Sequence, residues 1–373
     1  MTIQTKDLQE ACKSILGAVD TDSALKNVAF GYDTLEVEAS GKVLNLNVTN
    51  GEYYVNVSLA LDNDESFRAV VDAKLFLALI SKVTTSAVEM TTTDNVLVVQ
   101  ANGKYQFPLK YDIDEMVVLP KIVVNNPTAN FVVQSATLVS ILDNNSREVN
   151  PGATMPAMKF YYLDQEGCLT FTNVSACVNS FTLPTTMKIM MTPKLVKLFK
   201  LFKDGDVSVT LGFEDVNGVA QARIVFKQDN VSITSILPND ASLVSSVPVV
   251  AIRGRVYKVF DNNVSFDKKY FLEAIDRLLL FDTTNSLNRG IGVFEFNEDS
   301  VDIFDSRRSN DEVIAYASGV CANKYTCCLD LEAIKTILLS TDSQVFNLSF
   351  GDNQSVVISF GNIRNVIAQR VLR

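Results

Sequence analysis

Most of the chain alternates hydrophobic and polar residues with a period of two, which is the pattern of half-buried β-strands. The runs are short and rich in β-branched residues, and they include 42–61, 95–110, 222–237 and 290–306. Turn signals such as Asn102-Gly103 and Asp204-Gly205 separate strand-like runs. The pattern predicts antiparallel strands joined by hairpins.

Six segments break this alternation with apolar residues three and four positions apart, the spacing of one helix face. They begin near Lys6, Ala73, Ala136, Pro193, Lys268 and Leu331. Their starts are 57 to 75 residues apart, so the helices are expected at regular intervals between groups of strands.

Local context repeats together with the helices. The segments 67–83, 187–203 and 325–341 each show a strand, a capping Asp or Thr, and a helix. Such self-similarity predicts one supersecondary unit used six times, or a two-helix domain used three times. Proline-bearing stretches at 119–130 and 242–254 are expected to separate the domains. The predicted fold class is α+β, with domains at 1–126, 127–250 and 251–373, each made of two helices packed on antiparallel sheets.

Composition places the chain among ordered globular proteins. Its 373 residues are 47% hydrophobic and 20% charged. No apolar run has a membrane-spanning length and no signal peptide is recognisable, so we expect a cytoplasmic protein without a membrane partner. The six cysteines have no CxxC spacing and are expected to be reduced and mostly buried.

Histidine is absent, which removes the usual general base and the commonest metal ligand. No Walker loop, GxGxxG or GxSxG motif is present. We therefore predict no catalytic residue, no cofactor and no bound metal. Carboxylates such as Asp302, Asp305 and Asp311 could bind a metal in principle, but acids in strand turns are usually solvated.

Charge is distributed unevenly in this acidic chain, whose formal net charge is −10. The six helical segments hold 13 basic and 7 acidic residues, whereas the rest of the chain holds 20 and 36. The segment "TPKLVKLFKLFK" (192–203) carries four lysines and no acid. One interpretation is that helices simply tolerate lysine better than strands do. The other is a positive surface formed by the helices together, which would attract a polyanion.

Repeats, helix order and particular segments together resemble the bacterial β sliding clamp, the beta subunit of DNA polymerase III. The segment 266–306 is similar to the start of that family's third domain, with a helix, an Arg-Gly and a strand hairpin. The segment 187–212 is similar to the second-domain strand, Pro-Lys helix, Asp-Gly turn and strand. The divergence fits a phage-encoded member as well as a cellular one.

The resemblance implies a homodimeric ring of two three-domain subunits, closed head to tail around double-stranded DNA, with helices lining the hole. It also implies the replicative DNA polymerase and a clamp loader as partners, and no enzymatic activity. The residues expected to contact DNA, without sequence specificity, are first Lys194, Lys197, Lys200 and Lys203, and then Lys6, Lys13, Lys74, Lys82, Arg147, Lys268, Lys269, Arg277 and Lys335. The alternative for each of them is an ordinary solvated charge.

Two further sites follow from the resemblance. The dimer contact would use Phe107 and Leu109 of one subunit with Leu280 and Phe281 of the other, and the alternative is that all four are core residues. A cleft for linear peptide motifs of partner proteins would include Met155, Val174, Val178, Ile367, Ala368, Gln369, Arg370, Val371, Leu372 and Arg373. The family's Asp-Gly-His-Arg turn is replaced here by "NVSACV" (173–178), so the motif preference of the cleft is left open.

Three other hypotheses compete with the closed ring. A clamp-like processivity factor could remain monomeric and bind DNA along one basic face. A β-rich virion protein would assemble into larger particles and would need no positive helices. An enzyme is the least supported hypothesis, since no motif supplies a reaction.

Overall fold

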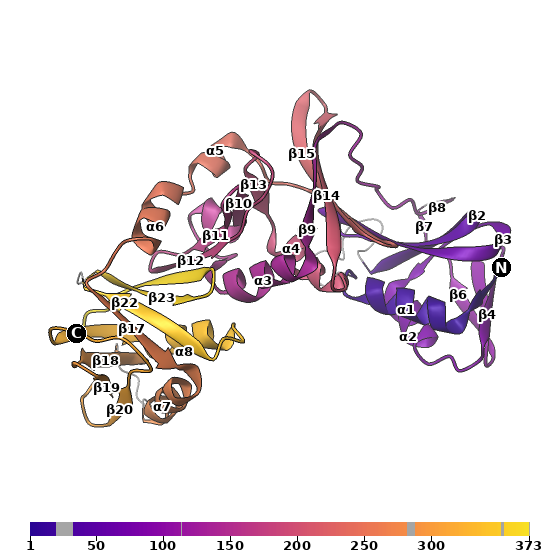
Figure 1. Ribbon diagram of the computed structural model, residues 1–373. Helices are drawn as coiled ribbons and strands as arrows, with labels where there is room; N and C mark the ends of the chain where they lie inside the picture. Colours follow the sequence, from indigo (N-terminus) through magenta and orange to yellow (C-terminus); the bar gives the residue numbers. More distant parts are fainter. Residues whose placement is uncertain (20–32, 113, 282–287, 352–353, 373) are drawn as a thin grey trace. The chain divides into compact units, whose positions relative to one another are not determined.

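The computed structural model describes residues 1–19, 33–112, 114–281, 288–351 and 354–372 (Figure 1). It contains two compact units, both mixed helix and antiparallel sheet. Unit 1 consists of Met1–Leu138 and Lys194–Pro238, and unit 2 of Val139–Pro193 and Asn239–Arg373. The middle third of the chain therefore contributes to both units.

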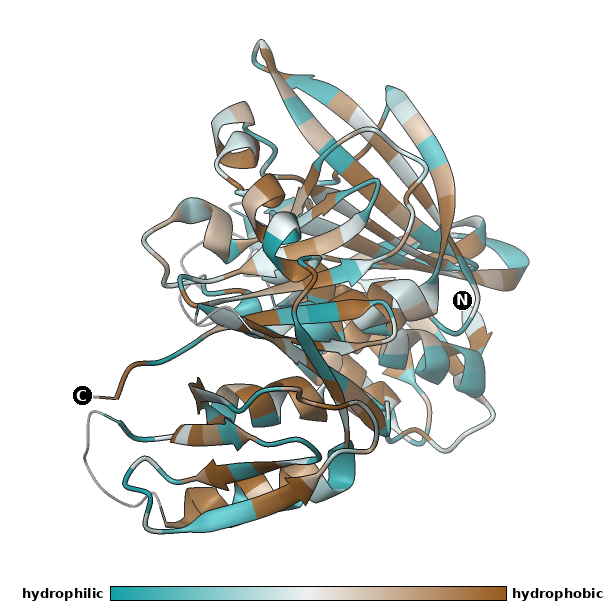
Figure 2. Ribbon diagram, turned by 60° about the vertical axis from the view of Figure 1, so that its left-hand side comes forward, coloured by the Kyte–Doolittle hydropathy of each residue, from teal (hydrophilic) through white to brown (hydrophobic). Residues whose placement is uncertain are grey.

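Unit 1 is built on two larger antiparallel sheets. The six-stranded sheet has the order β2 (Thr34–Thr49), β3 (Tyr53–Asp72), β16 (Val231–Ile236), β15 (Val219–Gln228), β14 (Asp206–Val216), β9 (Pro127–Gln134). The four-stranded sheet has the order β1 (Thr2–Gln4), β4 (Ala87–Thr93), β5 (Val96–Gln100), β6 (Lys104–Pro108). A small ribbon pairs β7 (Tyr111–Asp112) with β8 (Glu115–Met116). The strands are banded in teal and brown in Figure 2, as expected for alternation of polar and apolar residues.

The helices of unit 1 pack their apolar residues toward these sheets. They are α1 (Thr5–Leu16), α2 (Ala73–Ile80), and α4 (Pro193–Lys197) continued by the 3-10 helix η4 (Leu198–Leu201). α1 packs against α2 and buries Leu8 and Ile15. The Asp72 carboxylate accepts a hydrogen bond from the Leu75 amide and caps α2, as the sequence predicted.

Unit 2 contains an eight-stranded sheet, whose strands come from two separate parts of the chain, and a four-stranded sheet. Both sheets are antiparallel. The eight-stranded sheet has the order β13 (Ile189–Met191), β10 (Tyr161–Asp164), β11 (Gly167–Phe171), β12 (Ser175–Ser180), β24 (Ile363–Ala368), β23 (Ser355–Phe360), β22 (Val345–Phe350), β17 (Asn262–Asp267). The four-stranded sheet has the order β20 (Asp311–Ala315), β19 (Ser300–Phe304), β18 (Ile291–Phe296), β21 (Tyr325–Asp330).

Two apolar clusters hold unit 2 together. The helical elements are α3 (Ser135–Asn145, beginning in unit 1), η2 (Ser146–Glu148), η3 (Pro156–Lys159), α5 (Ala241–Ser245), α6 (Val249–Val256), α7 (Lys268–Leu280) and α8 (Leu331–Leu339). One cluster joins α7 and α8 to both sheets through residues such as Phe271 and Phe294. The other joins β11, β12 and β24 to η3 and α6. The carboxylates of Asp267 and Asp330 cap α7 and α8.

All six predicted helices are present, but two expectations about local structure were wrong. The segment 193–203 is not one α-helix, because it tightens to 3-10 geometry after Lys197. With about three residues per turn, Phe199 and Phe202 fall on the same side. Their ring centroids lie 5.0 and 6.5 Å from that of Phe226.

The second departure concerns 242–254, which was not among the six predicted helices and was expected to contain a domain boundary. It folds as α5 and α6, with the Asp240 carboxylate accepting hydrogen bonds from the Ser242 and Leu243 amides. These helices span five and eight residues, too short for a clear helical period. The expected boundary at residue 250 falls inside α6.

Candidate functional sites: a lysine-rich helix and an apolar cleft

The segment formed by α4 and η4 is anchored by its apolar side and presents lysines on the other. Leu195 and Phe199 are fully buried, while Lys197 and Lys200 are exposed. Lys194, at the start, is half-buried. The apolar residues fix the backbone, so Lys197 and Lys200 are held in place as positive charges at the surface of unit 1.

Lys203, just after η4, differs from Lys197 and Lys200. Its ammonium lies 2.5 Å from a carboxylate oxygen of Glu10 on α1. The hydrogen bond and charge of Lys203 lower the pKa of Glu10, and the charges of Lys6 and Lys13 act in the same direction. Glu10 in turn raises the pKa of Lys203. One predicted DNA contact is thus already paired with an acid.

The remaining predicted contacts of unit 1 are exposed lysines. They are Lys6, Lys13, Lys74 and Lys82. Within the described ranges, none of these four, nor Lys197 or Lys200, forms an ion pair. Together they give the helices of unit 1 a set of cations available to an external anion.

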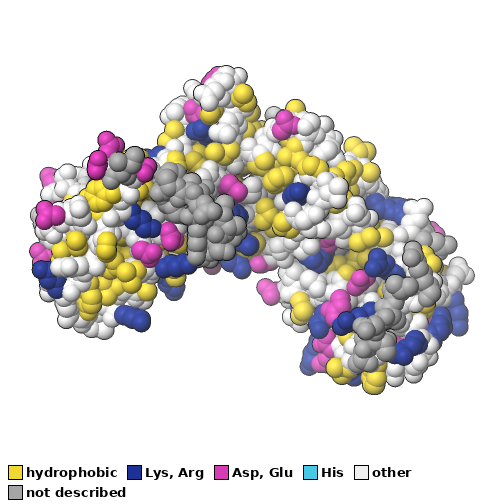
Figure 3. All heavy atoms as spheres, turned by 180° about the vertical axis from the view of Figure 1, so that it is seen from behind, with side chains coloured by type: hydrophobic (Ala, Val, Ile, Leu, Met, Phe, Trp, Pro, Cys, Tyr) yellow, Lys and Arg dark blue, Asp and Glu magenta, His cyan; other side chains and the backbone are white. Residues whose placement is uncertain are grey.

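The predicted contacts of unit 2 are mostly engaged inside the protein. Arg277 donates two hydrogen bonds to Glu312, at 2.6 and 2.9 Å, and Lys335 lies 2.8 Å from Asp276. Lys268 donates to the backbone oxygen of Thr341. Basic side chains beside acidic ones are visible on the face drawn in Figure 3. Lys269 is exposed.

Among the predicted DNA contacts of unit 2 that form ion pairs, Arg147 has the least exposed side chain. Its side chain is 17% exposed and pairs with the neighbouring Glu148. It also donates to the side-chain oxygen of Asn365 at 2.9 Å. The structure therefore places Arg147 in an internal network.

A cleft of about 500 Å³ opens in unit 2 beside α6 and the end of β24. Its apolar lining consists of Met155, Met158, Phe171, Val174, Ala176, Pro248, Ala251, Ile252, Val366 and Ala368. Its polar lining consists of Thr172, Asn173, Ser175, Arg255, Gln354 and Ser355. A mostly apolar floor with a few polar groups at the rim is the usual form of a site for a short peptide or a small molecule.

Of the residues expected in a peptide cleft, Met155, Val174 and Ala368 line this pocket, whereas two others do not. Val178 and Ile367 are buried and do not line it. Val178 lies within the apolar cluster beneath the cleft. Ile367 belongs to the cluster around α7 and α8, because alternate residues of a strand point to opposite faces.

The expected C-terminal tail is only partly involved in the cleft. Gln369, Arg370, Val371 and Leu372 are not among its lining residues. The Arg370 amide instead donates to the backbone oxygen of Cys328. Arg373 lies outside the described residues. The contribution of α6 was missed, although the apolar run 247–252 could have indicated it.

The four predicted dimer residues divide into two pairs. Phe107 and Leu109 are 3% and 8% exposed, and the Phe107 ring packs 5.6 Å from that of Phe76. Leu280 and Phe281, at the end of α7, are 72% and 53% exposed. The first pair occupies the core of unit 1, because the inward face of β6 is covered by α2.

The described residues give no sign of a metal site or a membrane-spanning helix. No group of three or more cysteine or acidic residues with metal-binding geometry was found among them. Asp305 accepts hydrogen bonds from the Arg307 and Ser309 amides and so shapes a turn. None of the helices in this part of the chain is both long and apolar enough to cross a bilayer.

Solved structures with the same fold include bacterial sliding clamps. The DNA polymerase III subunit beta of Pseudomonas aeruginosa superposes with a TM-score of 0.82 at 15% identity, covering 100% of this chain and 99% of that one. The Bacillus subtilis sliding clamp gives the same values. The P. aeruginosa clamp bound to griselimycin gives a TM-score of 0.83, again at 15% identity and with the same coverage. No family model matches the chain. No curated protein matches it by sequence either.

Proposed function

We propose that this protein is a DNA sliding clamp, a non-enzymatic processivity factor that encircles duplex DNA. The main supporting observation is that Lys197 and Lys200 are exposed on a segment anchored by apolar residues and have no ion-pair partner among the described residues. The chain also has the fold of sliding clamps over its full length. The exposed lysines Lys6 and Lys13 of α1 and Lys74 of α2 add further positive charges to this surface.

Electrostatics explains how such a surface would act. Duplex DNA carries one negative charge per about 1.7 Å of axis. Long, flexible lysines attract phosphates without reading base edges, so the attraction is similar at every position along the duplex. A closed ring lined in this way would stay on the DNA yet slide along it.

Ring closure is part of the proposal, as a head-to-tail homodimer of chains with domains at 1–126, 127–250 and 251–373. Strands β6 and β20 are edge strands of their sheets. Each could therefore accept a strand from a second chain through backbone hydrogen bonds. Leu280 and Phe281 would supply apolar contact, whereas Phe107 and Leu109 would support β6 from inside.

The cleft beside α6 is proposed to receive short apolar segments of the replicative polymerase and the clamp loader. Its apolar lining and polar rim support this assignment. The P. aeruginosa clamp of the same fold has been solved bound to griselimycin, and we propose griselimycin as a probe of this cleft.

Negative-stain electron microscopy of the purified protein tests the ring directly. Class averages with a six-lobed outline and a central hole are expected. Crescent-shaped particles, together with a solution mass near 41.1 kDa, would instead favour the monomeric processivity factor. Larger regular particles would favour the virion protein.

A further inference from the structure

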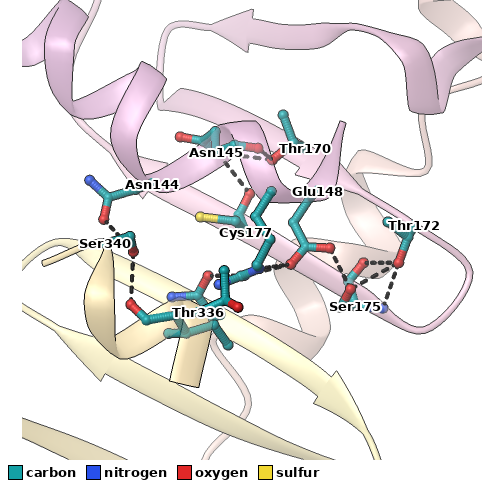
Figure 4. Close-up of polar contacts among 12 residues, drawn as sticks. Asn144, Asn145, Glu148, Thr170, Thr172, Ser175, Cys177, Thr336 and Ser340 are labelled. Carbon is teal, nitrogen blue, oxygen red and sulfur yellow. Dashed lines mark hydrogen bonds and ion pairs between the residues drawn. The ribbon is translucent and has the colours of Figure 1, made fainter. Parts of the chain in front are cut away.

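A buried carboxylate lies beneath one wall of the cleft without lining it. Glu148, at the end of η2, is 2% exposed. Its Oε1 atom accepts a hydrogen bond from Arg147 Nε at 2.7 Å, and its Oε2 atom accepts one from the Ser175 hydroxyl. Figure 4 shows the contact between Glu148 and Ser175, which joins η2 to the start of β12.

Ser175 connects this carboxylate to the turn that forms the cleft wall. The Thr172 amide donates to the Ser175 backbone oxygen at 2.8 Å, and the two hydroxyl oxygens are 2.8 Å apart. The Thr172 hydroxyl accepts from the amides of Val174 and Ser175, at 3.2 and 3.1 Å. Fixing Ser175 therefore fixes the whole turn, including the exposed apolar side chain of Val174.

Arg147 carries the same network to another wall of the cleft. Its Nη2 atom donates to Asn365 on β24, directly before the lining residue Val366. The Ala368 amide also donates to the Val174 backbone oxygen at 2.8 Å. The turn at 172–175 and the end of β24 are thus connected twice. One connection is a direct backbone hydrogen bond, and the other runs through the side chains of Arg147 and Glu148.

We propose that Glu148 and Arg147 are positioning residues for ligand binding in the cleft, forming an ionic clip that holds two of its walls at the correct spacing. This inference rests on the proposed peptide-binding role of the cleft. It also gives Arg147 a task other than contacting DNA, consistent with its small exposure and its two engaged nitrogens.

The charge of Glu148 is the part of the clip that a neutral residue cannot replace. A carboxylate accepts at both oxygens, whereas a glutamine amide has one accepting oxygen and one NH2 group that only donates. Glu148→Gln would keep the shape but would turn a donor toward Arg147 or toward Ser175. Arg147 Nη1 is already buried without a hydrogen-bond partner in the described part of the chain, so the guanidinium has little capacity to find a substitute.

The binding test uses fluorescently labelled griselimycin and the full-length protein. Glu148→Gln is expected to weaken binding by about tenfold, the effect of losing one charged hydrogen bond. The control is Glu295→Gln on β18, which removes a carboxylate paired with Arg308; Glu295 does not line the cleft, and this variant should bind like wild type. Equal affinity of Glu148→Gln and wild type would overturn the proposal.

Removing and then restoring the hydroxyl at position 175 distinguishes a positioning role of Glu148 from a general loss of protein stability. Ser175→Ala is expected to weaken griselimycin binding, while Ser175→Thr, which keeps the hydroxyl, should restore it. In the Glu148→Gln background these two changes should differ little, because the acceptor is impaired. An equal loss for Ser175→Ala with and without intact Glu148 would contradict the clip.

Hydrogen exchange of the free protein tests the clip independently of any ligand. Faster exchange is expected in Glu148→Gln at 172–178 and 363–368, with the other described strands of unit 2 unchanged. If wild type fails to bind griselimycin but this exchange pattern appears, the peptide-binding assignment fails and the clip stands. Unchanged or uniformly faster exchange would overturn the clip itself.

Discussion

The lysine-rich segment of unit 1 and the α7–α8 pair of unit 2 contain similar basic residues in very different situations. Lys197 and Lys200 project from α4 and η4 without an acidic partner in the described chain. Arg277 and Lys335 are held by Glu312 and Asp276. The first pair of cations is available to an external anion, and the second is largely neutralised by the protein itself.

This difference shows why counting charges on helices is an incomplete guide to a binding surface. An ion pair with its acid within 3 Å presents a dipole rather than a charge to a phosphate several ångströms away. The pairs of unit 2 also connect separate elements, since Arg277 links α7 to β20 and Lys335 links α8 to α7. Their contribution is expected to be mainly structural.

Reversing the charge of the lysine-rich segment should have the largest effect on DNA binding. The variant changes four residues to glutamate: Lys194, Lys197, Lys200 and Lys203. Because attraction becomes repulsion at several phosphates, we expect DNA affinity to fall on the order of a thousandfold at low salt. Fluorescence anisotropy with a labelled 30-base-pair duplex measures the affinity, and retention on circular DNA measures encirclement.

A matched control changes four exposed lysines outside the predicted helices: Lys42, Lys121, Lys188 and Lys324. The total charge change is the same, so only the location differs. If both variants lost affinity equally, overall charge and not the segment would determine binding.

Removing the apolar support of the segment should have the next largest effect. Phe199 is fully buried and meets Phe226 edge-on at 5.0 Å. Phe199→Ala is expected to lower the free energy of unfolding by about 3–5 kcal/mol, measured by urea denaturation. Phe213→Ala, at a partly exposed site of the same unit, should cost less than about 1 kcal/mol. A small loss for Phe199→Ala would mean that the lysines are not held by packing.

Single neutralisations compare the two regions directly. Lys200→Gln should reduce the slope of log affinity against log salt by about 1, as expected for one phosphate contact. Lys335→Gln should change the slope much less, because Lys335 is already paired with Asp276. Equal slopes would show that ion pairing does not decide which cations meet DNA.

Releasing a paired lysine should have the smallest effect and the opposite sign. Glu10→Gln removes the acid that holds Lys203, so DNA affinity is expected to rise about twofold to threefold at low salt. Asp7→Asn removes an acid from the same helix without breaking an ion pair in the described structure. A rise of the same size in both variants would indicate a general charge effect.

Much of the fold was predictable because it depends on local patterns. The apolar spacing of α7 and the capping carboxylates Asp72 and Asp330 can each be recognised from a few neighbouring residues. The 3-10 end of the lysine-rich segment was not predictable, because the contacts of Phe199 and Phe202 with Phe226 involve a strand further along the chain.

The sites were predicted less well because they depend on which faces are covered. Alternation assigns Phe107 to one face of β6 but does not tell that α2 covers that face. The partner of Arg277 lies 35 residues away and that of Lys335 lies on another helix, so neither pair shows a sequence pattern. The resemblance to clamps indicated Met155, Val174 and Ala368, which line the pocket, while the contribution of α6 to its lining required the structure.

Two sheets combine strands from different thirds of the chain, and this determines where the chain can be truncated. Strand β3 pairs with β16, and β12 pairs with β24, so strands from the middle third complete a sheet in each unit. A fragment ending at residue 126 would leave β3 with a bare edge, and one ending at residue 250 would do the same to β12. Exposed edges of this length recruit other strands. Expression of the thirds as separate fragments should therefore give aggregates, and no single cut separates the two units, because each is made of two segments of the chain.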